Sequence, residues 1–126
     1  MEKTIVATTA APAAVGPYSQ AVSSGELVFC SGQIPLDPQT GDLVTGSIAA
    51  QTRRCMQNLA AVLEAAGSSL ANVVQVRALL TNIDDYAEFN EAYAEFVGSE
   101  PPARAAFAVA GLPRGAGIEI ECVAHL

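Results

Sequence analysis

Residues 101–113 read PPARAAFAVAGLP, an apolar run in which Arg104 is the only charged residue. The proline pair favours an extended entry, and the short apolar run after it is typical of a buried strand. A guanidinium keeps its proton in proteins, so Arg104 cannot adapt to burial by becoming neutral. The sequence therefore predicts that Arg104 meets an anion, which is either a carboxylate of the protein or a carboxylate of a ligand.

The segment before this stretch predicts a helix. Residues 82–85 cap its start, and Gly98 ends it. Asp85 and Glu88 have the spacing of a capping box. Asn90 falls inside the apolar stripe of this helix, and a buried amide needs partners. Asn90 therefore either bonds to neighbouring backbone or lines a pocket. The stripe consists of Tyr86, Phe89, Tyr93, Phe96 and Val97.

The segment after the stretch predicts a turn and then a last strand over residues 118–125, where the side chains alternate. Glu119 and Glu121 face the same side of this strand. Two interpretations are open for them. They form a paired-carboxylate site, or they are charges on an edge strand that block aggregation.

A helix is also predicted from Ile48, with Ser47 as its N-cap and Gly67 directly after its end. A strand is predicted over residues 72–81. Arg77 on this strand either forms an ion pair or lies on a solvated face. The opposite face, directed at the helices, is predicted to hold Val74, Val76, Ala78 and Leu80.

The first third of the chain predicts a short edge strand within residues 1–8 and a hairpin of residues 18–23 and 26–31 around Ser24-Gly25. The element order is then β-β-β-α-β-α-β-β, which indicates an α+β fold with a mixed six-stranded sheet and two helices on one face. The other face is predicted to stay apolar, so a closed barrel or a partner subunit must cover it. Its residues are Leu79, Val123 and either Phe107 or Ala106.

The size and composition suit one domain spanning residues 1–126. Hydrophobic residues make up 51% of the 126, but 24 of them are alanine, four are phenylalanine and none is tryptophan. The apolar fraction therefore overstates the side-chain volume available to a core. Burial shared between subunits would resolve this, so the composition predicts an oligomer.

The charge balance argues against nucleic-acid binding. The net charge is −7, and only two of the six cations, Arg53 and Arg54, are adjacent. Nucleic-acid binding requires several phosphates to be neutralised together, so we expect no nucleic-acid partner.

The cysteines and the lone histidine do not have the spacing of a zinc site, so we expect no metal. They are Cys30, Cys55, Cys122 and His125. No segment contains the roughly 20 consecutive apolar residues of a membrane span. An odd number of cysteines without a signal-peptide pattern predicts a reducing, cytoplasmic environment.

Several short motifs, taken in order, resemble the Rid proteins, the reactive intermediate deaminases of the YjgF type, and are most similar to the RidA subgroup. The resemblance runs from about Thr4 to the C-terminus. The motifs are Gly16-Pro17-Tyr18-Ser19-Gln20, Ser31-Gly32-Gln33-Ile34-Pro35, Glu64-Ala65-Ala66-Gly67, Asn90 with Tyr93, Pro102-Ala103-Arg104, Leu112-Pro113 and Ile118-Glu119-Ile120-Glu121.

The resemblance implies a chorismate-mutase-like fold and a homotrimer whose sheets form a central barrel, with three clefts between subunits. It implies hydrolysis of reactive 2-imino acids, or of their enamine tautomers such as 2-aminoacrylate and 2-aminocrotonate, to 2-keto acids and ammonia, with no cofactor. Arg104 would then hold the substrate carboxylate, and Glu119 would lie near the attacking water. The positions that match the cleft lining of the family are Tyr18, Ser31, Gly32, Asn90 and Ala106.

The chain departs from the family pattern at the predicted cleft. Many RidA members carry a cysteine where this chain has Ala106, an aromatic residue where it has Pro101, and a longer loop at residues 97–100. If the family cysteine acts through its backbone carbonyl, Ala106 preserves that role. If the cysteine acts through its thiol, Ala106 does not. The alternative function is non-catalytic binding of small carboxylic acids such as 2-keto acids, because Arg104 would serve both functions.

Overall fold

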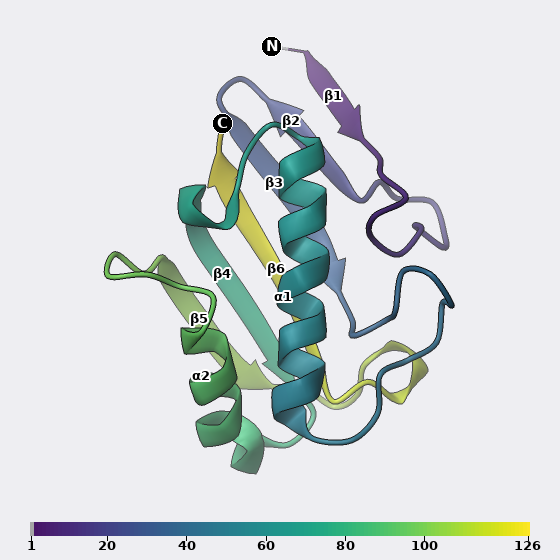
Figure 1. The fold of residues 1–126 in the computed structure, drawn as a ribbon, viewed down its shortest axis with the longest axis vertical. Coiled ribbons are helices and arrows are strands. Elements are labelled where there is room, and N and C mark those ends of the chain that lie inside the picture. The colour runs from purple at the N-terminus through teal and green to yellow at the C-terminus, as the bar shows by residue number, and fades with distance from the viewer. Residues whose placement is uncertain (1) are drawn as a thin grey trace.

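The computed structural model describes residues 2–126. A mixed six-stranded sheet in the order β1-β2-β3-β6-β4-β5 carries two helices on one face, and only β4 and β5 run parallel (Figure 1). The predicted element order and the α+β class are confirmed. The elements are β1 (Lys3–Val6), β2 (Ala21–Ser24), β3 (Leu27–Gln33), α1 (Ile48–Ala65), β4 (Val73–Leu80), α2 (Tyr86–Ala94), β5 (Ala103–Ala108) and β6 (Ile118–His125).

Helix α1 has the ends and the buried face that its sequence predicts. The Ser47 side chain accepts a hydrogen bond from the Ala50 amide, and Gly67 after the helix has a φ of 84°, which favours glycine. Leu59, Leu63 and their neighbours on one face of α1 are buried against the sheet, and this interface forms the core. The core residues contributed by the sheet include Val28, Val76, Ala78, Leu80, Ile118 and Ile120.

Helix α2 begins differently from the prediction. Asp85 makes no capping side-chain hydrogen bond, and the preceding 3-10 turn is capped by Asn82, which accepts from the Asp84 amide. Glu88 instead accepts a 2.8 Å hydrogen bond from the Ala49 amide. The predicted capping box is therefore wrong, because the Glu88 carboxylate satisfies a free N–H at the start of α1 and joins the two helices.

Strand β5 is an edge strand, which corrects the prediction that the stretch around Arg104 is buried. Among the described residues it pairs with β4 alone, so its other edge has no strand beside it. Four of its six residues are exposed, including Phe107 at 46%. The apolar sequence of this strand predicted burial on both sides. Within one chain, however, only β4 lies beside it.

Strand β6 lies inside the sheet, between β3 and β4, so the edge-strand interpretation of its two glutamates is wrong. Glu121 forms an ion pair with Arg77, its partner on β4, which confirms the ion-pair interpretation of Arg77. Glu119 pairs in register with Leu79 and carries no such partner among residues 2–126.

The face of the sheet opposite the helices is open in this chain and retains apolar side chains. Phe29 and Phe107 are each close to half exposed, and Leu79 and Val123 are half-buried. Ala106 packs on the helix side instead. Val74 was predicted to face the helices but is 44% exposed, because the register between β4 and β6 shifts between Val73 and Gln75. Within residues 2–126, no helix is both long and apolar enough to cross a bilayer.

Candidate functional site

Arg104 lies on the helix side of β5, beside α2. It pairs in register with the buried Val76, which places its side chain on the covered face. Its guanidinium carbon lies 5.6, 5.1 and 5.1 Å from the ring centroids of Tyr86, Phe89 and Tyr93. Nη2 also donates a 2.8 Å hydrogen bond to the Tyr86 hydroxyl. We call Tyr86, Phe89 and Tyr93 the aromatic cage.

The aromatic cage holds Arg104 without neutralising it. Each ring contributes about 0.5–1 kcal/mol of cation–π attraction at a partly exposed site. Neither of the ion pairs among residues 2–126 involves Arg104. Of the two anions considered from the sequence, the internal carboxylate is therefore missing from the part of the chain that the structure describes, and most guanidinium donors are left for a ligand.

The cage residues were predicted only as the apolar stripe of α2, and their role around Arg104 was missed. Their spacing places them on one helix face, but nothing local indicates that β5 returns alongside it. The Tyr93 hydroxyl is buried and finds no hydrogen-bond partner among residues 2–126. Burial raises the pKa of the Tyr93 phenol, while the Arg104 charge acts in the opposite direction.

Replacing Tyr86 with phenylalanine removes one hydrogen bond to Arg104 and keeps the ring. A hydrogen bond to a charged group contributes about 1.5–3 kcal/mol when buried, and the Tyr86 side chain is 38% exposed. We therefore expect KM for a carboxylate substrate to rise about fivefold to tenfold, with kcat changed by less than about twofold. Steady-state kinetics on a purified Tyr86→Phe protein would check this, and an unchanged KM would show that the hydroxyl does not position Arg104.

Asn90 and Ala106 lie on the two elements that carry the aromatic cage and Arg104. Asn90 is half-buried on α2, one turn after Tyr86, and Ala106 is half-buried two residues after Arg104 on the same face of β5. No side-chain hydrogen bond of Asn90 occurs within residues 2–126. Of the two alternatives for Asn90, the bond to neighbouring backbone is therefore not formed, and the amide remains available to line a pocket.

A second group of predicted residues lines a hollow of about 380 Å³ that does not include Arg104. This volume falls in the range of small-molecule pockets. Tyr18, Gly32 and Glu119 meet there, together with Arg114 from the turn before β6. Arg114 adopts a left-handed φ of 59° and donates a 2.8 Å hydrogen bond to the Gly41 carbonyl, which fixes one rim.

Gln20 lines this hollow, and Ser31, which does not line it, supports the segment beside it. Gln20, only 5% exposed, accepts a hydrogen bond from the Thr8 amide and donates to the Thr8 and Pro12 carbonyls, at 2.7, 3.0 and 2.8 Å. The Ser31 hydroxyl donates a 2.6 Å hydrogen bond to the Ser19 carbonyl. Ser31 therefore holds the segment that carries Tyr18, and Gln20 has a structural role that sequence reasoning missed.

Glu119 is the acid–base candidate of the hollow. Burial raises the pKa of its carboxyl, and the neighbouring Glu121 charge raises it further. A carboxyl whose pKa moves toward neutral is better suited to exchange protons with a substrate. Within residues 2–126, no three His, Cys, Asp or Glu side chains come together as metal ligands.

Gly32 leaves the space that Glu119 occupies. A Cβ at position 32 would lie 2.9 Å from the Glu119 Cδ atom, closer than real Cβ contacts. We expect Gly32→Ala to displace the flexible carboxylate while the protein stays folded, because the rest of the strand is unaffected. The expected loss of kcat is at least ~10-fold, as for a misplaced acid–base group. Kinetics and circular dichroism on this variant would test it, and wild-type kcat would contradict the placement of Glu119.

The two groups do not meet within one chain. Arg104 lies on the helix side of the edge strand β5, whereas Glu119 lies on β6 with Gly32 and Tyr18, and Arg104 does not line their hollow. One chain therefore presents the candidate anion-binding group, Arg104, at one edge of the sheet and the candidate acid–base group, Glu119, elsewhere.

Comparison with known proteins settles the family. The sequence model of the family described as Endoribonuclease L-PSP matches residues 8–126. A RutC family protein of Pyrococcus horikoshii is 47% identical over 123 residues, which cover 98% of both chains. The chain belongs to the Rid family.

The Rid assignment agrees with both sequence and structure. A 2-iminobutanoate/2-iminopropanoate deaminase of Homo sapiens is 45% identical over 120 residues, which cover 95% of this chain and 88% of that protein. The crystal structure of RidA from Psychrobacter sp. PAMC 21119 superposes with a TM-score of 0.95 at 43% identity, covering 98% and 99% of the two chains. The sequence motifs therefore identified the family correctly, and the fold is the Rid fold.

Proposed function

We propose that this protein hydrolyses reactive 2-imino acids and their enamine tautomers to 2-keto acids and ammonia. The observation that carries the proposal is the Arg104 guanidinium, held by the aromatic cage and without an acidic partner among the described residues. A small imino acid supplies the missing carboxylate, which arginine binds with two parallel hydrogen bonds. The deaminase name of the human relative supports the same substrate class.

In the proposed reaction, Arg104 fixes the substrate carboxylate and thereby the adjacent C=N carbon. A water molecule oriented by Glu119 attacks this carbon, and the imine nitrogen takes up a proton. The tetrahedral carbinolamine then collapses to the keto group as ammonia leaves. Orientation alone contributes up to ~7–11 kcal/mol in ideal intramolecular cases, and one acid–base group contributes about 10²–10⁴-fold. Neither step needs a nucleophilic side chain.

We further propose that the working protein is a homotrimer with a central barrel and with sites between subunits. The separation of Arg104 from Glu119 in one chain and the apolar open face of the sheet both support this arrangement. Multi-angle light scattering at micromolar concentration should give three times 12.9 kDa, about 39 kDa. A mass of one chain would remove the basis for a shared site.

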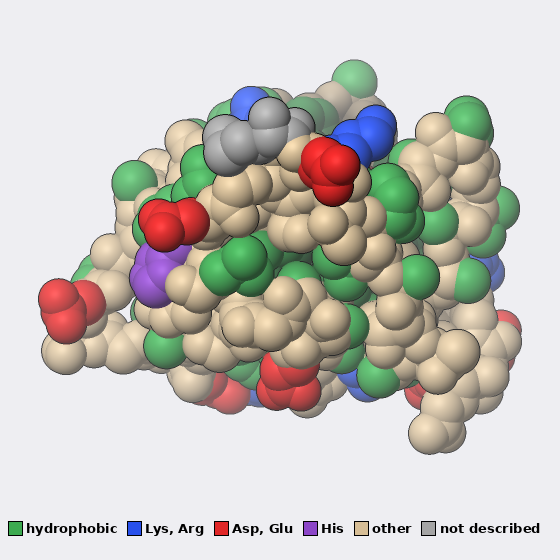
Figure 2. Space-filling model, turned by 90° about the horizontal axis from the view of Figure 1, so that it is seen from above, with side chains coloured by type: hydrophobic (Ala, Val, Ile, Leu, Met, Phe, Trp, Pro, Cys, Tyr) green, Lys and Arg blue, Asp and Glu red, His purple; other side chains and the backbone are tan. Residues whose placement is uncertain are grey.

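An RNA-directed activity is not proposed, although the description of the family names an endoribonuclease. The net charge of −7 opposes binding to a polyanion. Figure 2 shows one face of the molecule, on which cationic side chains occur singly among acidic ones and form no continuous basic surface.

The direct test generates 2-aminoacrylate with a pyridoxal-phosphate enzyme and measures the rate of pyruvate release with and without this protein. Acceleration that scales with protein concentration supports the deaminase. Binding of 2-ketobutyrate by calorimetry without any acceleration would instead support the alternative function, a non-catalytic protein that binds small carboxylic acids.

A further inference from the structure

Arg114 is a cation in the hollow of the proposed site that has no role in the proposed reaction. It lies in the turn before β6 and lines the same hollow of about 380 Å³ as Glu119, Tyr18 and Gly32. Arg114 and Glu119 carry opposite charges, yet neither of the ion pairs among residues 2–126 joins them. The hollow therefore contains a guanidinium without a carboxylate partner in the described part of the chain.

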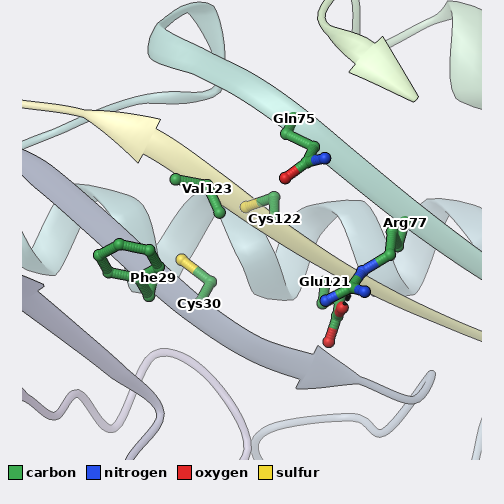
Figure 3. Close-up of a pocket in the computed structure, with 7 residues that line it drawn as sticks. All are labelled: Phe29, Cys30, Gln75, Arg77, Glu121, Cys122 and Val123. Atoms are coloured by element: carbon green, nitrogen blue, oxygen red, sulfur yellow. Dashed lines mark ion pairs between the residues drawn. The ribbon is translucent and has the colours of Figure 1, made fainter. Parts of the chain in front are cut away.

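Two other arginines are neutralised within the chain. Arg77 pairs with Glu121 in a separate hollow of about 170 Å³, where the two side chains lie together (Figure 3). Arg53 also has a carboxylate partner. Arg114 differs from both, because its one hydrogen bond among residues 2–126 goes to the neutral Gly41 carbonyl. A guanidinium has five N–H donors, so most of those of Arg114 are left for a ligand.

The backbone holds this side chain at the rim of the hollow in an unfavourable conformation. Arg114 has a φ of 59° and a ψ of 19°, in the left-handed region. Glycine adopts this region without a steric cost, whereas a residue with a Cβ atom does not. Strained positions of this kind occur often at binding sites. The bond to Gly41 offsets part of the cost but leaves the charge of Arg114 unpaired.

A buried amide of the same hollow also lacks a partner. Gln33, at the end of β3, lines the hollow and is only 7% exposed. Its side chain makes no hydrogen bond within residues 2–126, whereas Gln20, which also lines the hollow, uses both ends of its amide. Because a buried amide without a partner is unfavourable, it indicates a polar group supplied from the hollow. The N–H donors of Gln33 suit an anionic oxygen.

The hollow is larger than the smallest substrate requires. Its volume of about 380 Å³ lies in the range of pockets that hold drug-sized ligands, whereas the imine derived from 2-aminoacrylate has only three carbons. Space therefore remains for a substrate side chain, and Arg114 and Gln33 line the same hollow. A guanidinium and an amide together favour an acidic group in this space.

We propose that Arg114, together with Gln33, binds a second carboxylate at the end of the substrate side chain, so that the site accepts 2-imino acids derived from acidic amino acids. This inference rests on the proposed function, because it concerns the same substrate. Arg104 holds the carboxylate next to the C=N carbon, and Arg114 holds the distal one. The reaction is unchanged: water adds to the C=N carbon, and ammonia leaves.

The test compares two substrates that differ in the side chain. Flavin amino-acid oxidases generate the imines of 2-aminobutyrate and of glutamate in the presence of catalase, and the rate of keto-acid release is measured for wild type and Arg114→Gln. Glutamine keeps a donor for the Gly41 carbonyl but carries no charge. We expect the ratio of kcat/KM for the glutamate imine to that for the 2-aminobutyrate imine to fall about fivefold to tenfold.

Two controls separate the charge of Arg114 from its contact with the loop. Arg114→Lys keeps the charge and should retain most of the ratio. Arg53→Gln removes a paired arginine outside the hollow and should leave the ratio unchanged. If wild type accelerates only the 2-aminobutyrate imine, or if Arg114→Gln keeps the wild-type ratio, the inference is overturned while the deaminase proposal stands.

Calorimetry decides the inference even where neither imine is hydrolysed faster, a result that would refute the proposed function. It compares binding of 2-ketoglutarate with binding of 2-ketobutyrate, which lacks the distal carboxylate. We expect wild type to bind 2-ketoglutarate at least ~fivefold more tightly and Arg114→Gln to lose this preference. Equal dissociation constants for the two keto acids in wild type would overturn the inference.

Discussion

Replacing Arg104 with alanine should lower kcat/KM for 2-aminoacrylate-derived imine by at least ~100-fold. Within residues 2–126 the guanidinium has no carboxylate partner, so its donors are available to the substrate. Removing a charge-assisted, two-point contact costs about 2–3 kcal/mol, which corresponds to about two orders of magnitude in rate. The coupled pyruvate assay measures this loss directly.

Two further variants separate the role of Arg104 from charge and from stability. Arg104→Lys keeps the charge but lacks the planar fork, so we expect it to recover only part of the activity. Arg53→Ala removes an exposed arginine paired with Glu95 at 2.8 Å and should keep wild-type kinetics. Wild-type kcat/KM in Arg104→Ala would refute the deaminase site as proposed.

Mixed oligomers of two inactive variants should regain activity if each site takes Arg104 from one subunit and Glu119 from the next. Arg104→Ala and Glu119→Gln should each retain about 1% of wild-type activity or less. In a randomly mixed trimer, an intact site needs a Glu119→Gln subunit to supply Arg104 and an Arg104→Ala subunit to supply Glu119. With equal mixing, each of these two conditions is met at half of the sites. About a quarter of the sites are then intact, which gives about a quarter of wild-type activity.

The experiment requires refolding the two variants together, with each variant refolded alone as reference. Mixing Arg104→Ala with an Arg104→Ala/Glu119→Gln double variant is the matched control, because no subunit then supplies Arg104. Activity near the mean of the parents in the first mixture would show that sites do not span subunits. The control should stay at background in either case.

Local patterns predicted most elements because their signals lie within a few residues. Ser47 and Gly67 marked the ends of α1, and the alternation in residues 118–125 marked β6. The errors concern neighbours supplied by distant segments. Glu88 was assigned to its own helix but bonds to the Ala49 amide, 39 residues earlier in the chain.

The candidate site shows the same division between what local motifs predict and what contacts between distant segments decide. The motifs named Arg104, Glu119, Tyr18, Gly32 and Asn90, and they identified the family. They did not show that Tyr86, Phe89 and Tyr93 surround the guanidinium, because α2 and β5 are brought together only by packing.

The sequence by itself determined the order of the elements, the Rid family and an arginine that must meet an anion, since these follow from short-range patterns and from a charge that cannot be lost. Only the tertiary structure decided that the run around Arg104 is an edge strand, that the glutamates of residues 118–125 lie in the middle of the sheet, and that Arg114 and Glu119 line one hollow. The physical reason is that strand order and register are set by contacts between distant segments, where burial is shared across the whole sheet.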